Sequence, residues 1–178
     1  HRDGGYCRVM GRISRKKRIL LIGLILLVLL AGTGVGGLLV YTGRIRLNHP
    51  SPEKYPVRGV DVSHYQGAID WQVLSAQSIQ FAYIKATEGS SLVDEYFAQN
   101  WQDAHQTALY VGAYHFFSFD SPGQSQAENF IRTVPETDNA LPPVIDLEYY
   151  GDKASDPPER EGVRRELDAL IRALKEQY

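Results

Sequence analysis

The chain has 178 residues, of which 43% are hydrophobic and 22% are charged, and its formal net charge is -2. This composition is typical of a globular protein and lacks the charge excess of disordered or nucleic-acid-binding chains, so we expect no nucleic-acid partner. The charges are unevenly distributed, because residues 1–18 carry seven basic side chains and one acid. A basic N-terminal region therefore precedes a mildly acidic remainder.

Residues 19–43 contain no charged side chain and are rich in Leu, Ile, Val and Gly. About 20 apolar residues cross a bilayer as a helix, so this stretch predicts a transmembrane segment. The basic cluster before it predicts a cytoplasmic N-terminus and an extracellular remainder. A cleaved signal peptide is the alternative, since it has the same order of basic and apolar regions. The apolar run exceeds the roughly 7–15 residues of such a signal, which favours an uncleaved anchor in the cell membrane.

The segment after the apolar stretch differs from it in composition. Residues 44–56 include three prolines within 50–56, which predict a short, extended spacer. Cys7 is the only cysteine and precedes the apolar stretch, so the domain expected over 57–178 contains no disulfide and depends on its core for stability.

Strand-like and helix-like segments alternate from Val57 onward. This alternation predicts an α/β fold with a parallel sheet and right-handed crossovers. At the third helix, Ser121 is the expected N-cap and Pro122 the expected first helical residue. The expected strands cover 57–62, 80–86, 109–117 and 142–150; the expected helices cover 70–76, 94–107, a segment from 121 on, and a segment after Pro158 with the apolar stripe Val163, Leu167, Leu170, Ile171 and Leu174.

Four β/α units occupy about half the roughly 250 residues that an eight-unit barrel typically needs. We therefore expect the first four units of an irregular (β/α)8 TIM-like barrel, truncated at its C-terminus. The sequence is then a fragment, and Met10 is a candidate for the true start. The competing interpretation is a small open α/β sheet that is complete with four strands.

The expected strand over 142–150 ends in two carboxylates. Side chains two residues apart on a strand share a face, so Asp146 and Glu148 would project together. Their repulsion tends to raise one pKa and leave the other group ionised, which suits a general acid beside a charged stabiliser. Two alternatives remain: a frayed strand end with solvated acids, and a site for a divalent cation.

The other expected strands also end in polar or aromatic residues. In a parallel α/β domain these ends lie on one rim, where catalytic groups gather. A rim of Asp, Glu, Lys, His and Tyr suits a sugar-binding groove, with carboxylates for the chemistry and rings that stack on pyranose faces. Five segments carry this pattern: 58–67 (RGVDVSHYQG), 69–71 (IDW), 85–89 (KATEG), 112–117 (GAYHFF) and 146–148 (DLE).

In this order and spacing, the five segments resemble glycoside hydrolase family 25, the Chalaropsis-type lysozymes, which are 1,4-β-N-acetylmuramidases. The resemblance implies hydrolysis of the bond between N-acetylmuramic acid and N-acetylglucosamine in peptidoglycan. Glu148 matches the family's general acid/base, and Asp146 matches an acid that stabilises positive charge or orients the substrate's acetamido group. Asp61 matches an acid on the first strand, and Tyr114 matches an aromatic residue of the groove.

Four further residues complete the expected substrate-binding set: Lys85, Glu88, His115 and Tyr65. Lys85 and Glu88 equally suit a supporting ion pair. His115 and His64 lack the spacing of a metal site, so either substrate contact or structural hydrogen bonding is expected.

The remaining aromatic residues have structural interpretations as well as functional ones. Trp71 and Trp101 are expected in the core. Tyr149 and Tyr150 suit either stacking on substrate or covering the strand end. We expect no cofactor and no metal.

The resulting hypothesis is a membrane-anchored muramidase that acts on peptidoglycan glycan strands outside the cell. Its rival is a non-catalytic peptidoglycan-binding module with the same groove, and a third idea is a metal-dependent α/β hydrolase. Acids at 61, 146 and 148 favour the enzyme, because binding alone would not need a carboxylate at each position. The sequence leaves open whether a carboxylate or the substrate's N-acetyl group is the nucleophile.

Overall fold

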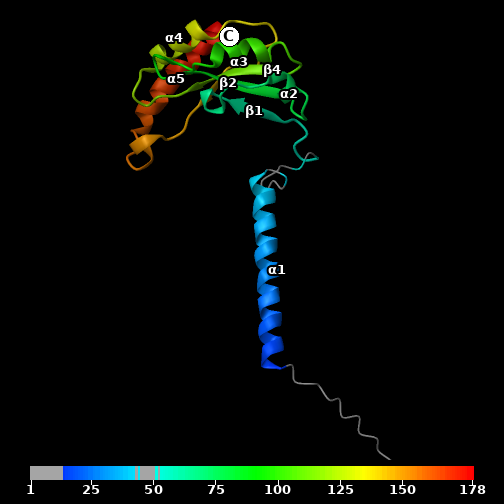
Figure 1. The fold of residues 1–178 in the computed structure, drawn as a ribbon. Helices are drawn as coiled ribbons and strands as arrows, with labels where there is room; N and C mark the ends of the chain where they lie inside the picture. Colours follow the sequence, from blue (N-terminus) through cyan, green and yellow to red (C-terminus); the bar gives the residue numbers. More distant parts are fainter. Residues whose placement is uncertain (1–13, 43, 45–50, 52) are drawn as a thin grey trace, which may run out of the picture. The chain divides into compact units, whose positions relative to one another are not determined.

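The computed structural model describes residues 14–42, 44, 51 and 53–178, and its contacts divide the chain into units 1–51 and 52–178. In the first unit, α1 (Arg15–Tyr41) is one apolar helix with no buried residue (Figure 1). Its length and composition would allow it to cross a membrane, although a signal sequence has the same properties. Cys7, Met10 and most of the predicted spacer lie outside the described residues.

The second unit contains a sheet whose strands follow the order β1-β2-β4-β5, all parallel (Figure 1). The predicted α/β class is thereby confirmed. A short strand, β3, pairs antiparallel with the end of β2 and was not predicted. The strands are β1 (Gly59–Val62), β2 (Phe81–Glu88), β3 (Leu92–Val93), β4 (Tyr110–Phe116) and β5 (Val144–Asp146).

Helices alternate with the strands as predicted, and α3, α4 and α5 lie on the same side of the sheet (Figure 1). The core fills the space between that side and the helices, and the predicted core residues Trp71 and Trp101 are buried in it. The predicted stripe of α5 also faces the core, where Leu170 and Leu174 are buried. The helices are α2 (Trp71–Ser75), α3 (Phe97–Ala104), α4 (Gly123–Thr133) and α5 (Arg160–Gln177), with short 3-10 helices η1 (His64–Gln66) and η2 (Gly151–Ala154).

The start of α4 differs from the prediction by one residue. Pro122 is the N-cap and Gly123 is the first helical residue, so the assignment of Ser121 as N-cap was wrong. The reason is a tertiary contact: a carboxylate of α5 accepts the hydrogen bond from the first helical amide, which a capping side chain would otherwise accept. The Gly123 amide donates to Glu166 Oε2 at 2.9 Å, while Ser121 Oγ donates to Ser90 Oγ at 3.4 Å.

Gly123 also lies directly against the backbone of α5. A Cβ at this position would lie 1.8 Å from the Glu166 carbonyl oxygen, which belongs to the backbone. We expect Gly123→Ala to force the helices apart and to lower the free energy of unfolding by about 1–3 kcal/mol or more, measured by urea denaturation. Gly162→Ala in α5 is the control, because its Cβ would meet the flexible ends of Glu159 and Arg165. Equal stability of the two variants would contradict this account of the contact.

Candidate active site

The register of the sheet places the acidic and aromatic candidates on one face. Asp61 pairs with Tyr83, and Lys85 lies two residues beyond Tyr83 on the same face of β2. Lys85 pairs in turn with Tyr114. Paired residues of neighbouring strands share a face, and residues two apart on a strand do so as well.

The same reasoning extends to the last strand. Phe116 lies two residues beyond Tyr114 and pairs with Asp146. Asp61, Tyr114 and Asp146 therefore project from the same face of the sheet, close to the carboxyl ends of three parallel strands. The structure brings these three predicted site residues together.

Glu148 lies beyond the strand that was predicted to carry it. β5 covers only Val144–Asp146: Pro142 and Pro143 lack the amide hydrogens that would extend it at its start, and its partner β4 ends at Phe116, which pairs with Asp146. Glu148 is exposed and close enough to Asp146 for its charge to raise the pKa of that carboxyl. Of the two acids expected on one strand face, only Asp146 lies on the strand; Glu148 follows it.

The cluster is electrostatically coupled. Partial burial raises the pKa of Asp146, the charges of Glu148 and Asp61 raise it further, and the Lys85 ammonium lowers it. Burial also raises the pKa of the Tyr114 hydroxyl, with contributions from Asp61 and Asp146. A proton is therefore held more tightly at Asp146 than at an isolated aspartate, which is the environment expected for paired catalytic carboxylates.

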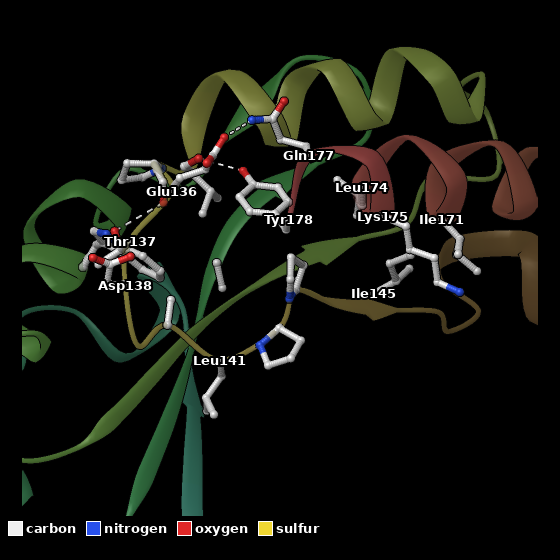
Figure 2. A pocket seen from close by; sticks show the side chains of 17 residues that line it. Glu136, Thr137, Asp138, Leu141, Ile145, Ile171, Leu174, Lys175, Gln177 and Tyr178 are labelled. Carbon is white, nitrogen blue, oxygen red and sulfur yellow. Dashed lines mark hydrogen bonds between the residues drawn. The ribbon is translucent and has the colours of Figure 1, made fainter.

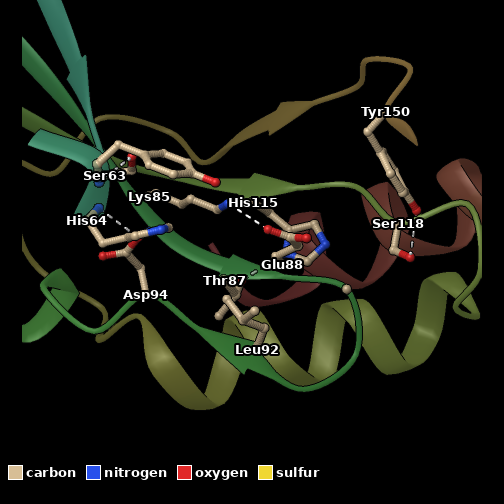
Figure 3. Close-up of polar contacts among 12 residues, drawn as sticks. Ser63, His64, Lys85, Thr87, Glu88, Leu92, Asp94, His115, Ser118 and Tyr150 are labelled. Atoms are coloured by element: carbon tan, nitrogen blue, oxygen red, sulfur yellow. Dashed lines mark hydrogen bonds and ion pairs between the residues drawn. The ribbon is translucent and has the colours of Figure 1, made fainter. Parts of the chain in front are cut away.

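Lys85 and Glu88 form the ion pair that was one of their two predicted roles. The Lys85 Nζ lies 2.6 Å from Glu88 Oε2 (Figure 3). It also lies 4.8 Å from the centre of the Phe116 ring. Lys85 is only 6% exposed, and its positive charge lowers the pKa of Asp146.

His115 lies on the opposite face of β4, next to Ile145 in the register. Its ring is fully buried, with Nδ1 2.7 Å from Thr87 Oγ1 (Figure 3). The other ring nitrogen, Nε2, lies 2.9 Å from Gln126 Oε1. The Gln126 amide nitrogen donates to Ser118 O, so its oxygen accepts from the histidine. Burial lowers the pKa of His115. The structure thus gives His115 structural hydrogen bonds and does not bring it to the groove.

The aromatic residues near the rim take different positions. Tyr65 is 81% exposed in η1, directly after β1. The Tyr150 hydroxyl lies 3.2 Å from Ser118 Oγ and accepts from the Phe119 amide, so this ring covers the end of the strand (Figure 3). Tyr149 is 57% exposed and stacks on the Phe119 ring.

Two hollows border the end of the sheet. One of about 960 Å³ is lined by Ile145, Leu174 and Tyr178 among others, and contains none of the predicted site residues (Figure 2). Ile145 and Asp146 point to opposite faces, so this hollow lies behind the carboxylates. A second hollow of about 440 Å³ contains Glu148 and Tyr149. The smaller hollow borders a predicted catalytic acid, but its other walls come from α5 and the residues around it, and it includes none of Asp61, Tyr114 and Asp146.

Within residues 14–42, 44, 51 and 53–178, no three or more His, Cys, Asp or Glu side chains are arranged to hold a metal ion. The cation-site interpretation of Asp146 and Glu148 therefore has no ligand set to support it in the described part of the chain.

The chain belongs to glycosyl hydrolase family 25, whose model matches residues 60–178. A family 25 glycosyl hydrolase from Bacillus anthracis has a similar structure, with a TM-score of 0.73 and 53% identity, covering 75% of this chain and 62% of that one. A bacterial lysozyme from Streptomyces coelicolor has a TM-score of 0.62 and 32% identity, covering 68% and 58% of the two chains. The parallel sheet thus corresponds to part of the family 25 barrel, rather than to a complete four-stranded fold.

Curated relatives give the same family. Lysozyme M1 of Streptomyces globisporus is 39% identical over 97 residues, which cover 52% of this chain and 33% of that protein. The uncharacterized protein YegX of Escherichia coli K12 is 43% identical over 105 residues, covering 56% of this chain and 39% of that protein. The match therefore spans about two fifths or less of either relative.

Proposed function

We propose that this chain is part of a membrane-anchored muramidase that hydrolyses the β-1,4 bond between N-acetylmuramic acid and N-acetylglucosamine in peptidoglycan. The observation that carries the proposal is the placement of Asp61 and Asp146 on one face of the sheet, with Glu148 close enough for its charge to act on Asp146. Membership of a family that includes lysozymes supports the same reaction.

In this mechanism Glu148 is the general acid that protonates the leaving oxygen. It is exposed and faces open space, so a sugar ring can approach it. Asp146 stabilises the positive charge that develops on the sugar, or orients the acetamido group. Glycoside hydrolysis needs an acid on the leaving side and a negative group on the other side of the bond. In the direct route Asp146 attacks the anomeric carbon while the leaving oxygen takes the proton of Glu148, and water then releases the sugar from Asp146. In the substrate-assisted route Asp146 instead orients the acetamido group that attacks, and Glu148 keeps the same role.

The supporting residues act on this pair. Asp61 adds negative charge beneath the sugar, and the Tyr114 ring provides an apolar wall. Lys85 favours the ionised form of Asp146, because its ammonium opposes the effect of burial on that pKa. Tyr65 is exposed enough to stack on a pyranose ring.

Removal of the Lys85 charge is expected to change the pH dependence of the reaction. In Lys85→Met the pKa of Asp146 rises, because the one neighbouring group that lowers it is lost. If Asp146 acts in its ionised form, the acidic limb of the kcat/KM profile moves to higher pH. Lys153→Met is the control, since Lys153 pairs with Asp120 at 2.8 Å. An acidic limb at the same pH in Lys85→Met and wild type would remove Asp146 from this role.

The alternative function is peptidoglycan binding without cleavage. It is favoured by the ring of Tyr65, which is 81% exposed directly after β1 and suits contact with a glycan strand whether or not a bond is cleaved. The groove face of β1, β4 and β5 would still contact a glycan strand.

The reaction is tested by incubating the full chain, purified in detergent, with peptidoglycan and identifying the sugar at each new reducing end. Muramic acid at that end supports the muramidase. Glucosamine there would indicate cleavage of the other glycosidic bond and contradict the proposal. Sedimentation with peptidoglycan without any release would instead identify the binding module.

The membrane anchor is tested separately by fractionating cells that express the full chain. An uncleaved anchor leaves the intact chain in the membrane fraction after carbonate extraction. A shortened chain in the medium would show that α1 (Arg15–Tyr41) is a cleaved signal sequence.

A further inference from the structure

Asp94 is a buried carboxylate that the proposed mechanism does not use. It lies between β3 and α3, is 3% exposed, and has a side chain with no exposed surface. Aspartate is seldom buried so completely unless it is paired. Its oxygens accept three hydrogen bonds: from the His64 amide at 2.9 Å, from the His64 ring Nδ1 at 2.8 Å and from the Tyr96 amide at 3.0 Å (Figure 3).

The double contact with His64 fixes both parts of that residue. One carboxylate oxygen, Oδ2, accepts from the backbone amide and from the ring. The first bond fixes the main chain where η1 begins, and the second fixes the orientation of the imidazole. To donate to a carboxylate, Nδ1 must carry a proton, which leaves Nε2 as the acceptor of a neutral ring. Asp94 thus connects a segment 30 residues further along the chain to the turn after β1.

The oriented imidazole supports Tyr65. The two rings have centroids 4.1 Å apart and an angle of 35° between their planes. The turn also has internal bonds, since Ser63 Oγ accepts from the Tyr65 amide and Gln66 Oε1 accepts from the Ser63 amide. These bonds fix the shape of the turn, whereas Asp94 fixes its place against the body of the domain.

The turn and Asp94 both act on the groove itself. Burial raises the pKa of the Tyr114 hydroxyl, the charges of Asp61, Asp146 and Asp94 raise it further, and the Ser63 side chain lowers it. Asp61 lies only two residues before Ser63 on β1. A displacement of η1 would therefore move groups on two sides of the carboxylate cluster.

We propose that Asp94 is a positioning residue that, through His64, holds the Tyr65 ring at the rim of the groove, where the ring stacks on a pyranose face of a bound glycan. This inference rests on the proposed function, because the ring needs a sugar to contact. An aromatic contact of this kind strengthens binding by about threefold to tenfold. Loss of Asp94 should therefore weaken glycan binding by the same factor as loss of the ring.

The variant Asp94→Ala removes both acceptor oxygens, so the contacts with His64 and with Tyr96 are lost together. His64→Ala is the second variant, because it removes the support of Tyr65 without changing the buried carboxylate. Asp70→Ala is the control: Asp70 also accepts from a backbone amide, that of Val73 at 3.0 Å, but this bond caps α2 and involves neither His64 nor Tyr65.

The experiment measures binding of a soluble β-1,4-linked N-acetylglucosamine tetramer to the full chain in detergent. We expect Asp94→Ala, His64→Ala and Tyr65→Ala each to weaken binding by about threefold to tenfold, and the double variant of positions 94 and 65 to bind no more weakly than Tyr65→Ala. Asp70→Ala should bind as wild type does. If the double variant lost the product of the two single effects, or if binding were unchanged in Asp94→Ala, the proposal would be overturned.

Amide hydrogen exchange separates this inference from the proposed function. The His64 amide should exchange faster in Asp94→Ala and at the wild-type rate in Asp70→Ala. If wild type neither binds nor cleaves glycan, the proposed function fails, while the exchange rates still decide whether Asp94 fixes η1. An unchanged rate at His64 in Asp94→Ala would refute the positioning role, whatever the activity.

Discussion

Glu148→Gln is expected to lower kcat by about 10²–10⁴-fold, the contribution typical of a general acid. Glutamine has nearly the same shape, but it has no acidic proton to transfer to the leaving oxygen. Because Glu148 is exposed, the change removes no buried contact, and the fold should be retained. The measurement is the rate at which reducing ends appear from peptidoglycan, with circular dichroism as the test of folding.

Glu161→Gln is the matched control for this prediction. Glu161 is an exposed carboxylate on α5 that lines the same hollow as Glu148. If proximity to the hollow were sufficient, both variants would lose activity. Activity within threefold of wild type in Glu148→Gln would assign the acid role to another group, with Asp146 the first to test.

Phe130→Ala is expected to lower the free energy of unfolding by about 3–5 kcal/mol. The Phe130 ring is fully buried on α4 and packs edge-on against His115, at 6.2 Å between centroids, and Tyr178, at 5.9 Å. Alanine would leave a cavity where α4, α5 and the sheet meet, and the rigid ring neighbours can close it only in part. Urea denaturation followed by tryptophan fluorescence gives the change, since Trp71 and Trp101 are buried in the same core.

The control is Glu128→Ala, two residues earlier on the same helix and exposed. Its effect should stay within about 0.5 kcal/mol, as is usual for surface positions. A loss below 1 kcal/mol in Phe130→Ala would mean that the core between α4 and α5 adjusts far more than close packing predicts.

Much of this fold could be predicted from the sequence, because strands and helices have different hydrophobic periods. The alternation of the two periods gave the parallel sheet, and the ends of its strands gave the positions of Asp61 and Asp146. The strand β3 could not be found in this way, since two residues, Leu92 and Val93, show no period. The start of α4 also escaped prediction, because its first amide bonds to Glu166 on another helix.

The sequence predicted the site residues that lie together on one face of the sheet. It did not predict contacts between segments that are far apart in the chain. The alternation of side chains along a strand places Tyr114 and His115 on opposite faces of β4. Because a strand of this kind is buried on both faces, its sequence does not show which face holds the groove. Asp94 was missed because its role depends on His64, 30 residues away. A lone aspartate before a helix gives no sequence signal of such a partner.

The order of the strands has a consequence for how the protein is made. Neighbours in the β1-β2-β4-β5 sheet follow one another along the chain, so each new strand joins the outer edge of the previous one. No strand on this path has to insert between two that are already paired. At a synthesis rate of about 5–20 residues per second, β1 and β2 can pair before β5 has been synthesised. The free edge of the latest strand then serves as the template for the next, and the sheet grows in step with translation.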